Sequence, residues 1–131
     1  MLSSAHPNFP ESAIYKKAQD IFALSRNISQ YLGHDLTSLN EDGSEHPHIY
    51  FSGDIVQQSV SLAPEILKAE RQPFSEQKQK HVASVTRLAN LLYKNCERLE
   101  RSGSNGKDFL PILRNELKKF RKLQRHWMLT L

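Results

Sequence analysis

Residues 107–131, KDFLPILRNELKKFRKLQRHWMLTL, carry the pattern that decides how this chain folds. Apolar side chains recur here at intervals of three and four residues, which places them on one side of an α-helix. Asp108 is expected to cap the start of this helix, and Pro111 is tolerated in its first turn. The side that we expect to pack on a core consists of Leu110, Leu113, Leu117, Phe120 and Trp127.

The same helix carries a basic side about a quarter-turn away from the apolar one. Four of its cations are spaced four, three and four residues apart, so they line up along the helix. Only Glu116 interrupts the run, so ion pairs within the helix cannot neutralise it. We call this set the basic stripe: Arg114, Lys118, Lys119, Arg121, Lys122 and Arg125.

The net charge of +4 is concentrated in this last stretch. Residues 107–131 hold seven basic and two acidic residues, whereas residues 1–106 hold eleven basic and twelve acidic ones. Such asymmetry favours a polyanionic partner, although a solvated helix face gives the same composition. We expect the basic stripe to contact phosphates of RNA or DNA, because such contacts release condensed counterions without reading the base sequence.

Three further segments have helical periodicity, and no stretch is a convincing strand. They cover residues 11–32, a span from Ile49 or Asp54 to Arg71, and residues 75–99. Gly33 is expected to end the first helix. The expected buried positions are Ile14, Ala18, Ile21, Ile28 and Leu32; Ile55, Leu62, Ile66 and Ala69; and Val82, Val85, Leu88, Ala89, Leu92, Cys96 and Leu99.

Proline and serine positions refine these helices. Pro64 lies in the middle of the second helix, where it removes a backbone hydrogen bond and costs about 3 kcal/mol unless the helix bends. We therefore predict a kink or a break near residues 60–64. Ser75 is expected to cap the third helix, with its hydroxyl accepting a free backbone N–H.

The predicted fold is all-α: an antiparallel up-down four-helix bundle with a kinked second helix. A chain of 131 residues supports one core, so residues 1–131 form a single domain, with residues 1–10 as a tail and 33–48 as a long loop. No apolar run is long enough for a membrane span, and residues 1–7 lack the pattern of a secretory signal. The single cysteine excludes an internal disulfide and fits a reducing cytosol, so we expect a cytoplasmic protein. Because no apolar run can span a bilayer, we expect no membrane partner.

The last five residues, WMLTL, are apolar on nearly every side. They either complete the bundle or pack against another subunit or protein, which makes Trp127, Met128 and Leu131 interface candidates. If packing against another protein is the whole function of this segment, the chain is a protein–protein interaction module that binds no nucleic acid.

Histidines are candidates both for metal ligands and for catalytic groups. His34, His46 and His48 share the long loop with acidic residues, but loop histidines beside acids are commonly polar surface, so we predict no metal and no cofactor. Arg121 and His126 form an R-x4-H pattern that resembles the motif of HEPN ribonucleases, which are also helical bundles. That resemblance implies a metal-independent ribonuclease as the alternative to our expectation of a non-enzymatic protein.

Residues 61–69, SLAPEILKA, resemble the Ser-Ile-Pro-x-Asn-Ile-Ala-Glu-Gly signature of the four-helix-bundle family encoded in 23S rRNA intervening sequences. Ser61, the aliphatic residue after it and Ile66 match in register, while the proline is displaced by one position. Residues 15–21, YKKAQDI, are similar to the first helix of that family. The same superfamily includes the accessory variability determinant proteins of diversity-generating retroelements.

The resemblance implies a bundle that assembles into a homopentamer and binds nucleic acid and, in the retroelement branch, a reverse transcriptase. The basic stripe agrees with that branch. We therefore expect an accessory or scaffold subunit that holds RNA or DNA for a partner enzyme.

Overall fold

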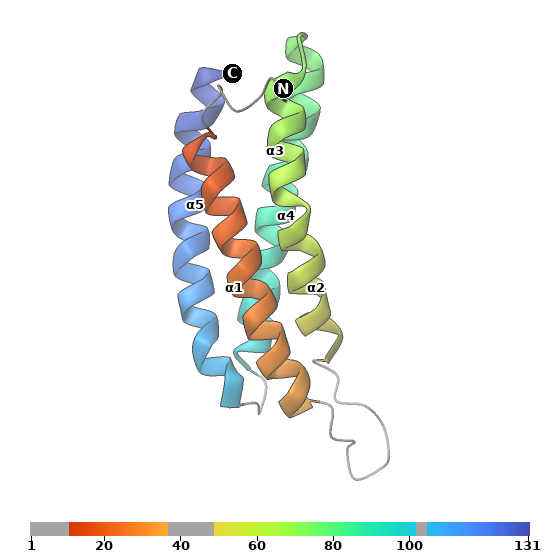
Figure 1. Cartoon of the computed structure of the whole chain (residues 1–131), viewed down its shortest axis with the longest axis vertical. Coiled ribbons are helices and arrows are strands. Elements are labelled where there is room, and N and C mark those ends of the chain that lie inside the picture. The colour runs from red at the N-terminus through yellow and green to blue at the C-terminus, as the bar shows by residue number, and fades with distance from the viewer. Residues whose placement is uncertain (1–10, 37–48, 102–104) are drawn as a thin grey trace, which may run out of the picture.

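A computed structural model of the chain describes residues 11–36, 49–101 and 105–131 (Figure 1). Within these residues the fold is helical and contains no strand, which confirms the all-α prediction. The predicted tail, residues 1–10, and most of the predicted loop lie outside the described residues. The elements are α1 (Ala13–Leu36), α2 (Ile49–Val60), α3 (Leu62–Arg71), α4 (Ser75–Leu99), the 3-10 helix η1 (Asn105–Phe109) and α5 (Leu110–Thr130).

The long helices lie side by side along the long axis of the molecule (Figure 1). Helix α1 contacts α2, α3 and α5, and α4 contacts the same three helices, so α2 and α3 together occupy one side of the bundle. Rising residue numbers in α4 pair with falling numbers in α5. Thr86 accepts a hydrogen bond from Gln124 at 2.7 Å, and Glu100 accepts one from Arg114 at 2.9 Å. These two helices are therefore antiparallel.

The predicted interruption of the second helix is confirmed as a break at Ser61. Pro64 has no N–H to donate to the preceding turn, so the ladder of backbone hydrogen bonds cannot continue unbroken through this position. Ser61 and Glu65 bridge the break: the Ser61 hydroxyl donates to the carbonyl of Gln57, and the Ser61 carbonyl accepts from the N–H of Glu65.

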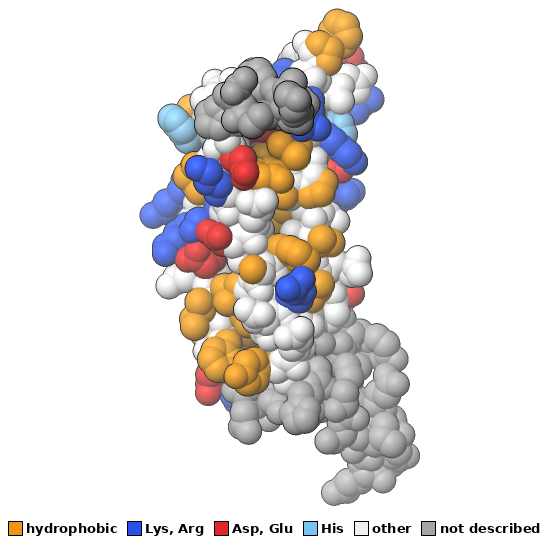
Figure 2. All heavy atoms as spheres, in the orientation of Figure 1, with side chains coloured by type: hydrophobic (Ala, Val, Ile, Leu, Met, Phe, Trp, Pro, Cys, Tyr) orange, Lys and Arg blue, Asp and Glu red, His pale blue; other side chains and the backbone are white. Residues whose placement is uncertain are grey.

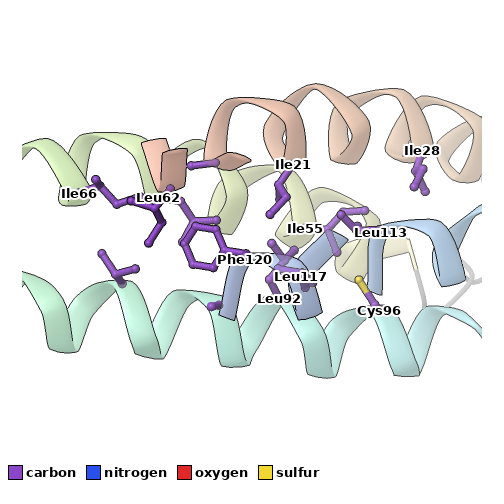
Figure 3. Close-up of a cluster of buried hydrophobic side chains, with 14 of the residues drawn as sticks. Ile21, Ile28, Ile55, Leu62, Ile66, Leu92, Cys96, Leu113, Leu117 and Phe120 are labelled. Carbon is purple, nitrogen blue, oxygen red and sulfur yellow. The ribbon is translucent and has the colours of Figure 1, made fainter. Parts of the chain in front are cut away.

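The apolar positions expected from the periodicity form the core, with Leu88 half-buried at its edge. Figure 3 shows how they interdigitate: Ile21 and Ile28 come from α1, and Leu113, Leu117 and Phe120 from α5. Phe120 is fully buried, and it is among the largest such side chains in the described part of the chain. This shared core fixes α5, and with it the basic stripe, against the other helices.

The helix ends correct three predictions. Helix α1 continues through Gly33 to Leu36, so residues 33–36 are helical rather than the start of a loop. Ser75 is the first residue of α4, not its cap, because the extended Phe74 already offers its carbonyl to the N–H of Lys78. Asp108 does not cap α5, because η1 leads directly into that helix through a helical Phe109.

Ser25 is buried in the apolar side of α1, and its hydroxyl is the buried side-chain polar group that has no hydrogen-bond partner among the described residues. An unpartnered buried hydroxyl costs about 1–3 kcal/mol. We expect Ser25→Ala to raise the free energy of unfolding by about 1 kcal/mol, measured by urea denaturation. The control is Ser59→Ala, because Ser59 is equally buried but donates to the carbonyl of Val56 at 3.0 Å. A Ser25→Ala variant no more stable than Ser59→Ala would contradict this expectation.

Candidate nucleic-acid interface

The basic stripe of α5 lies beside α4, and Arg121 connects the two helices. Its Nη2 donates to Oδ1 of Asn90 at 3.0 Å, and its guanidinium carbon lies 4.6 Å from the centre of the Tyr93 ring. Both partners are neutral, so they hold the guanidinium in place without cancelling its charge. Arg121 therefore presents a fixed positive charge at the seam between α4 and α5.

Two stripe residues are paired with carboxylates. Nε and Nη2 of Arg114 each lie 2.9 Å from Oε1 of Glu100, just beyond the end of α4. Hydrogen bonds with Tyr93 and then Glu100 raise the pKa of Arg114 above its ordinary value. Lys119 Nζ lies 3.0 Å from Oε2 of Glu116. These pairs remove Arg114 and Lys119 from the set of free cations.

Glu116 is shared between two helices. Its Oε1 accepts from Lys17 of α1 at 2.8 Å, while its other oxygen faces Lys119. The hydrogen bond from Lys17, followed by that from Lys119, lowers the pKa of Glu116 below its ordinary value. Glu116, the acidic residue inside the stripe, thus joins α5 to α1, on the side of α5 away from Arg121.

The remaining stripe residues are exposed cations: Lys118, Lys122 and Arg125. Within the described part of the chain, none of the three has a carboxylate within ion-pair distance. Figure 2, which looks onto α1, shows Lys and Arg side chains along the α5 edge of the molecule with a few acidic ones among them, and others along the opposite upper edge. Lys118, Lys122 and Arg125, together with Arg121, are therefore positive charges on α5 without a carboxylate partner among the described residues.

Helix α4 places two more cations beside the basic stripe, which the net charge of residues 1–106 did not indicate. Arg87 and Lys94 are seven residues apart, so they lie on the same side of the helix. Both line a groove of about 630 Å³ together with Asn90, the residue that holds Arg121, and with Met128 of α5. We call the combined surface the basic face: Arg87, Lys94, Lys118, Arg121, Lys122 and Arg125.

The terminal apolar segment divides between the core and the surface. Trp127 is 5% exposed and donates from Nε1 to Oε2 of Glu70 in α3 at 3.0 Å, so it completes the bundle. Leu131 packs against the core and is half-buried. Met128 and Leu129, at 42% and 86% exposed, are the parts of this segment that remain available for contact.

A second exposed apolar patch, which the sequence analysis missed, lies where α1 meets η1 and α5. The rings of Tyr31 and Phe109 lie 5.2 Å apart, and Tyr31 is 61% exposed. Ile112, one turn beyond Phe109, is also exposed. Helical spacing could have suggested this patch, because Ile112 falls outside the apolar side of α5.

The residues considered for catalysis do not point toward each other on their helix. Arg121 and His126 are five residues apart on one helix, so their side chains point about 140° away from each other. The expected metal candidates, His34, His46 and His48, have side chains outside the described residues. Elsewhere in the described chain, no group of three His, Cys, Asp or Glu side chains could hold a metal ion.

Comparison with known proteins found no matching family model, no matching curated protein and no matching solved structure. Among the helices that the structure describes, none has the length and apolar character needed to cross a membrane.

Proposed function

We propose that this protein is a non-enzymatic nucleic-acid-binding subunit built as an antiparallel up-down four-helix bundle. The observation that carries the proposal is the basic face, where six cations from α4 and α5 have no carboxylate partner among the described residues. Such a surface is costly to leave isolated, because like charges repel across it. A polyphosphate relieves that repulsion and releases its own condensed counterions.

The residues of the basic face differ in the contact they offer. Arg121 is already oriented by Asn90 and Tyr93, so little side-chain freedom is lost when its outward N–H groups meet a phosphate. Lys118, Lys122 and Arg125 are exposed side chains that can follow the phosphates of many backbones. This combination favours binding that tolerates different base sequences, as suits a subunit that holds RNA or DNA for another enzyme.

The resemblance of residues 61–69 and 15–21 to the intervening-sequence and retroelement accessory proteins supports the same proposal. It adds a partner, a reverse transcriptase or another nucleic-acid enzyme, and an assembly, a homopentamer in the cytoplasm. The break at Ser61 agrees with a specialised second helix, because the resembling segment begins at that residue.

Salt titration tests the binding itself. Each phosphate contact contributes about 0.7–0.9 to the magnitude of the slope of log affinity against log salt concentration. With three exposed unpaired cations on α5 alone, we expect a slope of magnitude about 2 or more for generic RNA and DNA. Fluorescence anisotropy at several salt concentrations gives the slope. Absence of binding at low salt would reject the proposed function.

Self-association is expected to use the patch formed by Tyr31, Phe109 and Ile112. Copies that met through the basic face would bring like charges together, whereas this patch is uncharged and exposed. We expect the double variant Tyr31→Ser with Ile112→Ser to have the molar mass of a monomer in light scattering, while the unmodified chain is oligomeric. The control is Leu129→Ser, which removes an exposed apolar side chain at the other end of α5. An unchanged assembly in the double variant would place the interface elsewhere.

A further inference from the structure

The groove beside the basic face has an apolar floor in addition to its cations. Leu91 of α4 and Met128 of α5 are 41% and 42% exposed, so neither is part of the core. Both line the groove, and Ala83 extends its apolar floor along α4. Phosphate contacts would leave these two apolar side chains unused. The groove can therefore contact the apolar part of a ligand as well as its phosphates.

Polar groups interrupt this floor at intervals. The side chains of Gln79, Thr86 and Asn90 lie along the same groove. Asn90 accepts a hydrogen bond from Arg121 at its Oδ1, so its amide N–H groups remain for another partner. Thr86 already accepts from Gln124 and donates to the carbonyl of Val82, so its hydroxyl is satisfied. Gln79 and Asn90 are thus the side chains with hydrogen-bonding capacity left for a ligand.

Two cations line the groove, both from the same side of α4. Arg87 and Lys94 belong to its lining, and no acidic residue lines it among those described. Across the seam, Asn90 links the groove to Arg121 and so to the α5 part of the basic face. A ligand in the groove therefore meets apolar side chains, amide groups and positive charge.

We propose that the groove binds the unpaired bases of a single-stranded nucleic acid. This inference rests on the proposed function and specifies its substrate class. The apolar faces of a base would lie on Leu91 and Met128, because a thioether makes favourable contacts with aromatic rings. Its polar edge would meet Gln79 or Asn90, and the adjoining phosphates would meet Arg87 and Lys94. The groove volume of about 630 Å³ falls within the range of pockets that hold small ligands, about 300–1,000 Å³.

The floor does not suit the other occupants that its position allows. A duplex hides the faces of its bases in the stack, so it would contact the cations and leave Leu91 and Met128 unused. A partner helix would need a continuous row of apolar sites at helical spacing, and here polar side chains interrupt that row. An unpaired base combines apolar faces with a polar edge, which matches the alternation in the groove.

The test compares a fluorescein-labelled single strand of about 12 nucleotides with a duplex of the same length. The variant Leu91→Ala with Met128→Ala keeps every charge and removes side chains that are already exposed. Losing the contact with one base should weaken single-strand binding about three- to tenfold, while duplex binding stays within about twofold. The salt slope for either probe should stay unchanged, because no phosphate contact is lost. The matched control is Val60→Ala, an exposed apolar truncation on α2.

The outcomes separate the inference from the proposed function. Selective loss of single-strand affinity supports the groove as a site for bases, and recovery of that affinity in Leu91→Ala with Met128 retained would locate the contact at Met128. Equal binding of both probes by the double variant and the unmodified chain overturns the inference and leaves phosphate binding intact. Failure of the unmodified chain to bind either probe overturns both.

Discussion

The double variant Lys118→Glu with Arg125→Glu is expected to bind nucleic acid on the order of 100-fold more weakly than the unmodified chain at low salt. Both side chains are exposed cations on α5 without a carboxylate partner among the described residues, so reversal breaks no ion pair. Each substitution removes one phosphate contact and places a repelling carboxylate beside the backbone. The magnitude of the salt slope should fall by about 1.4–1.8, the share of two phosphate contacts. Anisotropy titrations at several salt concentrations measure both quantities.

A variant of equal net charge distinguishes a located interface from general attraction. Lys16→Glu with Arg71→Glu reverses two exposed cations on α1 and α3, away from the basic face. If the basic face binds the phosphates, this control should lose only the small long-range part of the attraction, which salt screens. Equal loss of affinity in the two double variants would show that net charge alone drives binding, and the basic face would then have no special role.

The core was predictable because it depends on spacing, which a sequence displays directly. Phe120 and Trp127 fall on the apolar side of α5 by periodicity alone, and both are buried. Pro64 predicted the break in the second helix through chemistry that acts within one turn. The helix ends were less predictable, because a backbone turn can replace a side-chain cap. Phe74 and η1 take the places that Ser75 and Asp108 were expected to fill.

The candidate site was predictable only where it depends on a single helix. Periodicity placed the basic stripe on one side of α5, but which cations stay free depends on neighbours across the bundle. Glu100 is distant in sequence from the stripe, yet it pairs with Arg114 once α4 and α5 pack together. Arg87 and Lys94 were missed for the same reason: a net charge summed over residues 1–106 conceals which side of α4 faces α5. Their spacing of seven residues indicates that both lie on one side of α4. That spacing predicts a basic surface only once α5 is known to pack beside α4.

Cys96 is expected to react with iodoacetamide on the order of 1000-fold more slowly in the folded protein than in urea at pH 8. Its side chain is fully buried, and burial, together with the charge of Glu100, raises the pKa of the thiol to about 12 from an ordinary value of 9.0. The reactive species is the thiolate, and the reagent reaches this buried thiol only when the bundle opens, which is on the order of 1000-fold or more disfavoured in a stable domain. Mass spectrometry of timed samples gives both rates. Rapid labelling of the folded chain would contradict the packing of α4 against α5.

This thiol also reports on the bundle as a whole. Figure 3 places Cys96 in the same core as Leu113, so Leu113→Ala should cost about 2–5 kcal/mol and speed labelling by populating the open chain. Because the folded pKa lies above the unfolded one, the thiol favours folding below pH 9.0 and loses that contribution as the pH rises toward about 12. Labelling at pH 8 avoids that window.

Cysteine labelling at pH 8 also checks the fold of the charge-reversal variant. Lys118 and Arg125 lie on the surface, so their reversal should leave Cys96 protected. A variant that no longer binds nucleic acid but still shields this thiol has lost its phosphate contacts and kept its fold.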